Sequence, residues 1–258
     1  MQDLKRWFDK ARVPVKIEKK PLGSITNSVN NQDIFQMTVD TRGKENKREY
    51  FRIYYGHPKN DIRVVDTDSK NQQVILLVNE PEREYTVRTW DRIKADWVFH
   101  TQKSPNFLRK YLMGMDESHL FIAELPRNLG PINKIKDAHK ILKPDIVLEK
   151  EKNTKRIKRQ GEWFFIPVTI KECELIDKNS NLIEKKISIG TNSWRSRNSH
   201  VADQLINIRE NQFVSGKITH VEHKTLKLQG WFKVLRNNET RTSAISGTNI
   251  FNGVKFID

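Results

Sequence analysis

Three histidines lie close together in sequence, between residues 191 and 235, and are the side chains best placed for acid–base chemistry. His220 and His223 flank the apparent turn of a β-hairpin, and His200 precedes that hairpin. Two imidazoles near a turn can share a metal ion, or act as general acid and base in cleaving a phosphodiester. Their spacing matches neither the helical HExxH zinc pair nor a Cys/His finger. His200, His220 and His223 are therefore the candidates for catalysis, but we favour an ordinary polar role and predict no metal site or cofactor.

The strand after that turn, residues 224–234, alternates between apolar and polar positions. Its apolar face holds Leu226, Leu228, Gly230, Phe232 and Val234. Its other face holds Lys227, Gln229, Trp231 and Lys233. An exposed indole between lysines can stack on a base while the ammonium groups attract phosphates. The alternative is that a neighbouring helix covers Trp231 and the lysines only solvate the sheet.

Two further segments combine positive charges in a way that suits phosphate contact. Trp194, Arg195 and Arg197 lie in a polar stretch that we expect to be a loop, and guanidinium groups match phosphate geometry. Lys155, Arg156, Lys158 and Arg159 lie in a nearly all-charged stretch, which suits contacts that do not depend on sequence. Surface ion pairs and a solvated linker are the respective alternatives.

The overall charge points to a polyanionic partner. The chain has 47 Lys and Arg against 32 Asp and Glu, a formal net charge of +15. Binding to nucleic acid is favoured by such an excess because neutralised phosphates release their counterions. A basic surface that serves only solubility is the alternative.

The single cysteine, Cys173, allows no internal disulfide and favours a reducing compartment. No apolar run has the length of a membrane span, and residues 1–10 lack the apolar core of a signal peptide. We therefore predict a cytoplasmic protein without membrane contact. No phosphate-binding GxxxxGK[ST] or GxGxxG and no GxSxG is present, which removes the usual support for nucleotide hydrolysis, dinucleotide binding or an α/β-hydrolase site.

Two acidic clusters can be considered as metal ligands. Asp116, Glu117 and His119 follow Gly114, but an ordinary turn at the entry to a strand explains them as well. A second group of carboxylates occurs at Asp61, Asp66 and Asp68, without a lysine motif typical of nucleases. Neither cluster is therefore assigned as a site.

The elements that must position these residues are mainly strands. Apolar and β-branched runs predict strands at 34–39, 48–55, 62–66, 73–78, 85–89, 119–125, 163–170, 182–189 and 249–257. The run at 73–78 is apolar on both faces and so is expected to be a central strand. Helical spacing occurs at 4–11, 106–113, 133–142 and 201–208. Residues 169–177 alternate around Cys173, which we expect to be a small core residue.

We predict an α+β protein, rich in strands, with antiparallel sheets or small barrels in two units and a few short helices. The units are an N-terminal domain, 1–148, and a C-terminal β-rich domain, 161–258, joined by a basic linker or arm, 149–160. The expected function is binding of nucleic acid or a nucleoprotein, as a non-catalytic accessory subunit. A metal-dependent or histidine-based nuclease is one alternative, and a protein-interaction or scaffold subunit, for example a homo-oligomer, is another.

Overall fold

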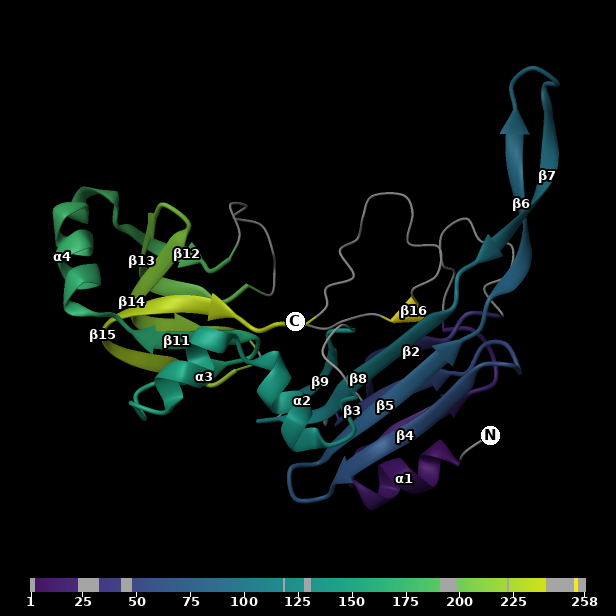
Figure 1. The fold of residues 1–258 in the computed structure, drawn as a ribbon, viewed down its shortest axis with the longest axis horizontal. Coiled ribbons are helices and arrows are strands. Elements are labelled where there is room, and N and C mark those ends of the chain that lie inside the picture. The colour runs from purple at the N-terminus through teal and green to yellow at the C-terminus, as the bar shows by residue number, and fades with distance from the viewer. Residues whose placement is uncertain are drawn as a thin grey trace. The chain divides into compact units, whose positions relative to one another are not determined.

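The computed structural model describes residues 3–22, 33–42, 48–117, 119–127, 131–190, 199–221, 223–239 and 253–254 (Figure 1). Within these ranges the predicted α+β class is confirmed: several largely antiparallel sheets carry a few short helices, and no barrel closes. The described residues divide into two compact units, one within 1–115, 119–139 and 239–257, the other within 116–118 and 140–238. No helix in the described part of the chain is both long and apolar enough to cross a membrane.

Unit 1 packs two sheets and a helix around one apolar core. Its sheets have the strand orders β1-β3-β2-β16 and β4-β5-β8-β9, with a separate β6-β7 ribbon. The elements are α1 (Leu4–Lys10), β1 (Val15–Glu18), β2 (Gln36–Arg42), β3 (Arg48–Tyr54), β4 (Asp61–Asp68), β5 (Gln73–Glu80), β6 (Arg83–Asp91), β7 (Asp96–Ser104), β8 (Phe107–Asp116), β9 (His119–Glu124) and β16 (Gly253–Val254). Strand β5 lies between β4 and β8 and is buried on both faces, as its apolar run predicts.

Helix α1 has the expected amphipathic packing. The Asp3 carboxylate caps it by accepting the Arg6 backbone N–H at 3.3 Å. Leu4 and Phe8 are fully buried, and the Phe8 ring meets Phe51 edge-on at 6.2 Å between centroids.

The β6-β7 ribbon continues the β5-β8 pair beyond a break in the hydrogen-bond ladder. The last pair before the break is Glu80–Phe107, and the first pair after it is Arg83–Ser104. Pro81 and Pro105 lie in the two gaps, and neither offers an N–H to the ladder. Past this point, β6 and β7 pair only with each other among the described strands.

Arg83 anchors the base of the ribbon to the core. Its guanidinium donates to the Asp33 carbonyl at 2.8 Å and to the Asn60 side chain at 3.2 Å. The neighbouring Glu80 carboxylate is buried, accepts the Phe35 N–H at 3.0 Å and lies 3.7 Å from Arg83. These contacts hold the start of β6 to unit 1.

Unit 2 is built on one open sheet with the strand order β10-β11-β15-β14-β13-β12. Its elements are α3 (Asp145–Glu151), β10 (Lys158–Gln160), β11 (Trp163–Pro167), α4 (Ile170–Lys178), the 3-10 helix η2 (Ser180–Leu182), β12 (Glu184–Ser188), β13 (Val201–Ile208), β14 (Asn211–Thr219) and β15 (Leu226–Arg236); α2 (Ile135–Leu142) lies at the division between the units. One sheet face holds the core around Phe165, Leu205 and Phe232. On the other face Ile176 of α4 packs on Ile206 and Phe213.

Several predicted elements differ from the structure. The expected helices at 106–113 and 201–208 are wrong, because these residues form β8 and β13 and pair with strands on both sides. Residues 170–178 form helix α4 rather than an alternating segment, and Cys173 on it is half-buried. A capping box explains that helix: Thr169 N–H donates to the Glu172 carboxylate at 2.7 Å, and the Thr169 hydroxyl accepts the Glu172 N–H at 3.3 Å.

Part of the predicted linker, 149–160, forms regular secondary structure. Residues 149–151 end α3 and 158–160 form β10, while the described units divide between His139 and Lys140. At the other end, 253–254 pair in parallel with β2 of unit 1 rather than with unit 2. Pro167 lies on an internal strand, β11, but β10 reaches only as far as Phe165, so Pro167 has strand pairing on one side only.

Candidate functional site

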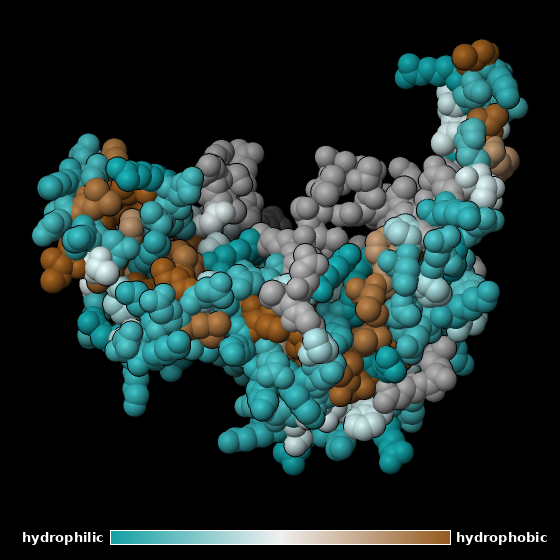
Figure 2. Space-filling model, in the orientation of Figure 1, coloured by the Kyte–Doolittle hydropathy of each residue, from teal (hydrophilic) through white to brown (hydrophobic). Residues whose placement is uncertain are grey.

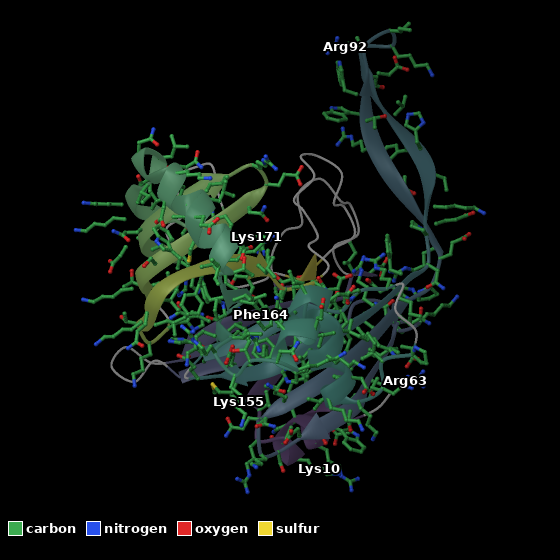
Figure 3. All side chains as sticks on the ribbon, turned by 60° about the vertical axis from the view of Figure 1, so that its left-hand side comes forward. Lys10, Arg63, Arg92, Lys155, Phe164 and Lys171 are labelled. Carbon is green, nitrogen blue, oxygen red and sulfur yellow. The ribbon has the colours of Figure 1, made fainter. Side chains whose placement is uncertain are left out.

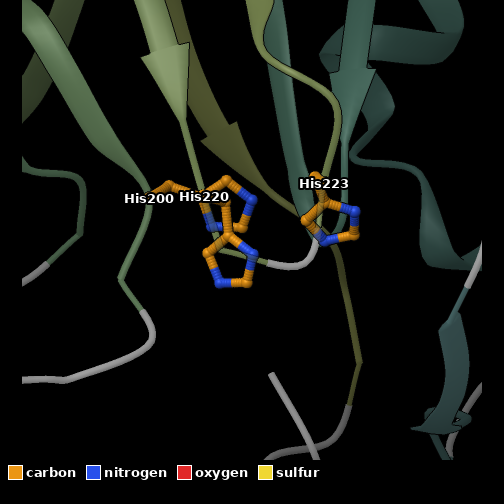
Figure 4. A group of neighbouring side chains, drawn as sticks. All are labelled: His200, His220 and His223. Carbon is orange, nitrogen blue, oxygen red and sulfur yellow. The ribbon is translucent and has the colours of Figure 1, made fainter. Parts of the chain in front are cut away.

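Strand register brings His200, His220 and His223 into one cluster in unit 2 (Figure 4). Val201 pairs with Thr219 at the end of β13 and β14, so His200 and His220 are the next residues beyond the last pair. The turn into β15 then carries His223 back towards them. Ring centroids are 4.3 Å apart for His200 and His220, 4.8 Å for His220 and His223, and 5.3 Å for His200 and His223. Their ligating nitrogens all lie within 4.8 Å of one another.

His200 is the buried member of the cluster, with 3% of its surface exposed. Among the described residues its Nε2 has no hydrogen-bond partner. Burial, reinforced by the neighbouring rings of His220 and His223, lowers the pKa of His200 to about 3. The ring is therefore neutral at pH 7, the form that can accept a proton or bind a metal ion.

Polar contacts fix the turn that carries His223. The Glu117 carboxylate accepts the Lys224 backbone N–H at 3.2 Å and lies 4.0 Å from Nδ1 of His223. From the other side, the Gln160 amide donates to the Lys224 carbonyl at 2.7 Å. The turn is thus held from both sides, which limits the positions of the His223 ring.

Gly161 lies directly against the cluster. A Cβ at this position would stand 3.1 Å from Nε2 of His223 and 3.2 Å from Cε1 of His200. Its φ of +56° is also one that glycine adopts more readily than other residues. The Arg159 guanidinium donates to the Gly161 carbonyl at 2.8 Å, which holds the turn between β10 and β11. The same guanidinium lies 3.7 Å from the Asp116 carboxylate. The glycine therefore leaves room between two imidazoles that any larger residue would fill.

The outer face predicted for β15 is partly covered. Trp231 is partly buried and packs with Ile176 and Phe213 under α4, and Lys233 Nζ lies 3.9 Å from the Glu172 carboxylate. A bulge between Ser215 and Gly216 leaves Gln229 and Gly230 without partners on β14, but the predicted apolar row is kept, since Leu226, Leu228, Phe232 and Val234 lie in one core cluster. Trp231 and Lys233 are therefore less exposed than expected. Lys227 is exposed as expected.

The other predicted contact residues lie in two segments, only one of which the structure describes. Trp194, Arg195 and Arg197 lie outside the described residues. Lys155, Arg156, Lys158 and Arg159 are all exposed in unit 2, where Lys155 is marked in Figure 3.

The acidic clusters do not form a common site. His119 contacts Glu49, at 2.8 Å from Nδ1, whereas Glu117 approaches His223. Asp66 accepts the Ile135 N–H at 3.0 Å, and Asp68 accepts backbone N–H groups of its own turn.

The β6-β7 ribbon carries a surface that the sequence reasoning missed. Trp90 pairs with Trp97 and Arg88 with Phe99, so these four side chains share one face, which we call the aromatic face. Trp90, Trp97 and Phe99 are 50%, 46% and 67% exposed. The two indoles meet edge-on at 5.5 Å, and the Arg88 guanidinium lies 4.6 Å from the Trp97 ring centre.

The signal for this ribbon is present in the sequence. Trp90 and Trp97 are placed symmetrically about the turn at 92–95, which carries Arg92 and Lys94. At that turn Ile93 is 97% exposed, hydrophobic atoms are visible at the free end of the ribbon (Figure 2), and Arg92 is marked there in Figure 3. Apolar side chains exposed together on a two-stranded ribbon indicate a contact surface.

Comparisons with protein-family models, with curated proteins and with solved structures find no match to this chain, so its function has to be argued from the residues themselves.

Proposed function

We propose that this protein binds nucleic acid, with the aromatic face of the β6-β7 ribbon as its main contact. The supporting observation is the exposure of Trp90, Trp97 and Phe99 on one side of a ribbon, with Arg88 over one indole. Exposed rings stack on bases, each stacked base contributing about 1–3 kcal/mol, and guanidinium groups add attraction to phosphates. A two-stranded ribbon is also narrow enough to enter the major groove of a duplex.

The charges of the ribbon favour a polyanion over an apolar protein surface. Arg92 and Lys94 are exposed at the tip, and the Asp91 carboxylate beside them accepts two N–H groups of the turn, at 2.9 and 3.1 Å. Near the base, Lys103 lies 3.9 Å from Glu82 and 3.7 Å from Glu84, so one cation there faces two carboxylates and the excess of positive charge is at the tip. With a chain charge of +15, the long-range field also attracts nucleic acid.

A fluorescence anisotropy titration with short single- and double-stranded DNA and RNA tests this proposal. Binding should weaken steeply with salt. The double variant Trp90→Ala/Trp97→Ala should lose affinity, while His100→Ala, on the opposite face of the ribbon, should not. Absence of binding to every oligonucleotide, together with elution as a dimer, would favour a scaffold role instead.

Phosphodiester cleavage at the histidine cluster is a second candidate function. The observation that favours it is the approach of three imidazoles, one of them buried and neutral. Such rings can take and return a proton during hydrolysis. If this activity exists, His220→Ala should stop cleavage but keep binding, whereas the tryptophan double variant should weaken binding first.

A further inference from the structure

We propose that His200, His220 and His223 bind one divalent transition-metal ion, with Zn²⁺ as the representative of its class. The site belongs to unit 2 and is independent of nucleic-acid binding by the ribbon of unit 1. The ligating nitrogens already lie within 4.8 Å of one another. Zn–N bonds of about 2.0–2.1 Å require nitrogens about 3.4 Å apart in a tetrahedron. The His200 ring is stacked on the other two at interplanar angles of 19° and 24°, so the side chains have to turn for their nitrogens to converge on one ion.

His200 supplies an observation independent of the clustering. Its ring is 3% exposed, and Nε2 has no hydrogen-bond partner among the described residues. Buried polar atoms are nearly always satisfied, so a nitrogen of this kind beside two other imidazoles calls for a partner. The backbone is fixed at this point, because the Ile189 N–H donates to the His200 carbonyl at 2.8 Å. A cation held between the rings would satisfy the nitrogen.

Gly161 keeps space open on the side of the cluster where an ion would bind. Nε2 of His223 and Nε2 of His200 lie 3.1 and 3.4 Å from the place where a Cβ would stand. Cε1 of His200 lies between these values, at 3.2 Å, so the two rings approach a common point that carries no side chain. A residue with a Cβ would press on both rings there.

Glu117 has the position of an outer-shell partner. Its carboxylate lies 4.0 Å from Nδ1 of His223, beyond hydrogen-bond distance, while Nε2 of that ring lies 3.1 Å from the place where a Cβ of Gly161 would stand. A carboxylate behind a ligating histidine orients the ring and makes it a stronger donor. It also places a negative charge next to the cation. Glu117 is therefore a positioning residue in this proposal and not a ligand.

The set of ligands selects the class of ion. Three imidazoles suit Zn²⁺, Cu²⁺, Ni²⁺ or Fe²⁺, whereas Mg²⁺ and Ca²⁺ prefer oxygen ligands. Three protein ligands also leave one position of a tetrahedral ion for water or another small ligand. We therefore expect an ion with an accessible coordination position.

Calorimetric titration of the tag-free, chelator-treated full chain with Zn²⁺ tests the proposal. We expect one ion per chain and no binding of Mg²⁺. His220→Ala and His223→Ala should abolish this binding, and Glu117→Gln should weaken it by about 10- to 100-fold. His100→Ala, which removes an exposed histidine of β7, should leave it unchanged.

Spectroscopy of Co²⁺ bound to the unaltered chain decides the matter if the histidine variants fail to fold. Intense visible absorption, with an X-ray absorption fit that needs three imidazole nitrogens, would support the site. The proposal is overturned if the unaltered chain binds no Zn²⁺ at one per chain, if His220→Ala folds and binds as tightly as the parent, or if bound Co²⁺ has only oxygen neighbours.

Discussion

The neutral, buried state of His200 predicts that unit 2 loses stability as pH falls below the ordinary pKa of histidine. In the folded protein the pKa of His200 is lowered from 6.5 to about 3 by burial and by the neighbouring His220 and His223 rings. Between these pH values the unfolded chain binds the proton and the folded chain does not. The contribution of neutral His200 to the free energy of unfolding is therefore fully present above pH 6.5, and it is lost progressively as the pH falls to about 3.

The size of this loss follows from the pKa difference. Each pH unit within the window costs about 1.4 kcal/mol, so at pH 5 the metal-free protein should be about 2 kcal/mol less stable because of His200 alone. The ring is almost wholly buried, so solvent does not screen the effect. His200→Gln removes the titrating group and should remove this part of the pH dependence, even if it lowers stability at pH 7.

Hydrogen–deuterium exchange of β13 and β14 peptides against urea concentration, with a chelator present, measures the stability of unit 2 at pH 7 and pH 5. Between pH 7 and pH 5, the free energy of unfolding of unit 2 should fall by about 2 kcal/mol more in the parent than in His200→Gln. His100→Gln controls for the loss of any histidine, since that ring is exposed on β7. An equal loss in the parent and in His200→Gln would refute the reasoning.

Three other predictions concern separate parts of the molecule. Trp97→Ala should reduce affinity for single-stranded DNA by roughly 5- to 100-fold, which corresponds to the free energy of stacking one base. Anisotropy titrations that show no change in affinity would mean that Trp97 does not contact the DNA. Gly161→Ala should weaken Zn²⁺ binding because its methyl group would press on two imidazoles, and calorimetry showing unaltered affinity would contradict this. Thr169→Ala should destabilise α4 by about 1 kcal/mol, seen as faster exchange of its amides, whereas Thr169→Ser should restore the cap.

The sequence predicts the fold class because hydrophobic alternation is strong in most strands. Residues 73–78 add a second signal, since their run is apolar on both faces and becomes the central strand β5. Residues 201–208 show the limit: their spacing fits a helix, but pairing with both β12 and β14 decides for a strand. Such pairing joins distant segments, and no local pattern contains it.

The histidine cluster could be anticipated only in part. His220 and His223 are neighbours in any tight turn, but His200 joins them because Val201 pairs with Thr219. Gly161 and Glu117 come from segments far away in sequence, and nothing in their local sequence links them to a histidine. The residue types therefore identified the candidates, while the register of the sheet assembled the site.

The two tryptophan-bearing hairpins show what decides whether an indole belongs to a core or to a surface. Trp231 and Trp97 both lie on antiparallel strands with cationic residues nearby, and their local patterns are alike. Trp231 is covered because α4 packs on that face of the sheet, and α4 begins at a Thr169–Glu172 capping box readable in the sequence. No helix follows the ribbon, because β7 runs through Pro105 directly into β8. An alternating strand therefore defines two faces, but only the element that follows it in the chain or packs on it determines which face stays exposed to a partner.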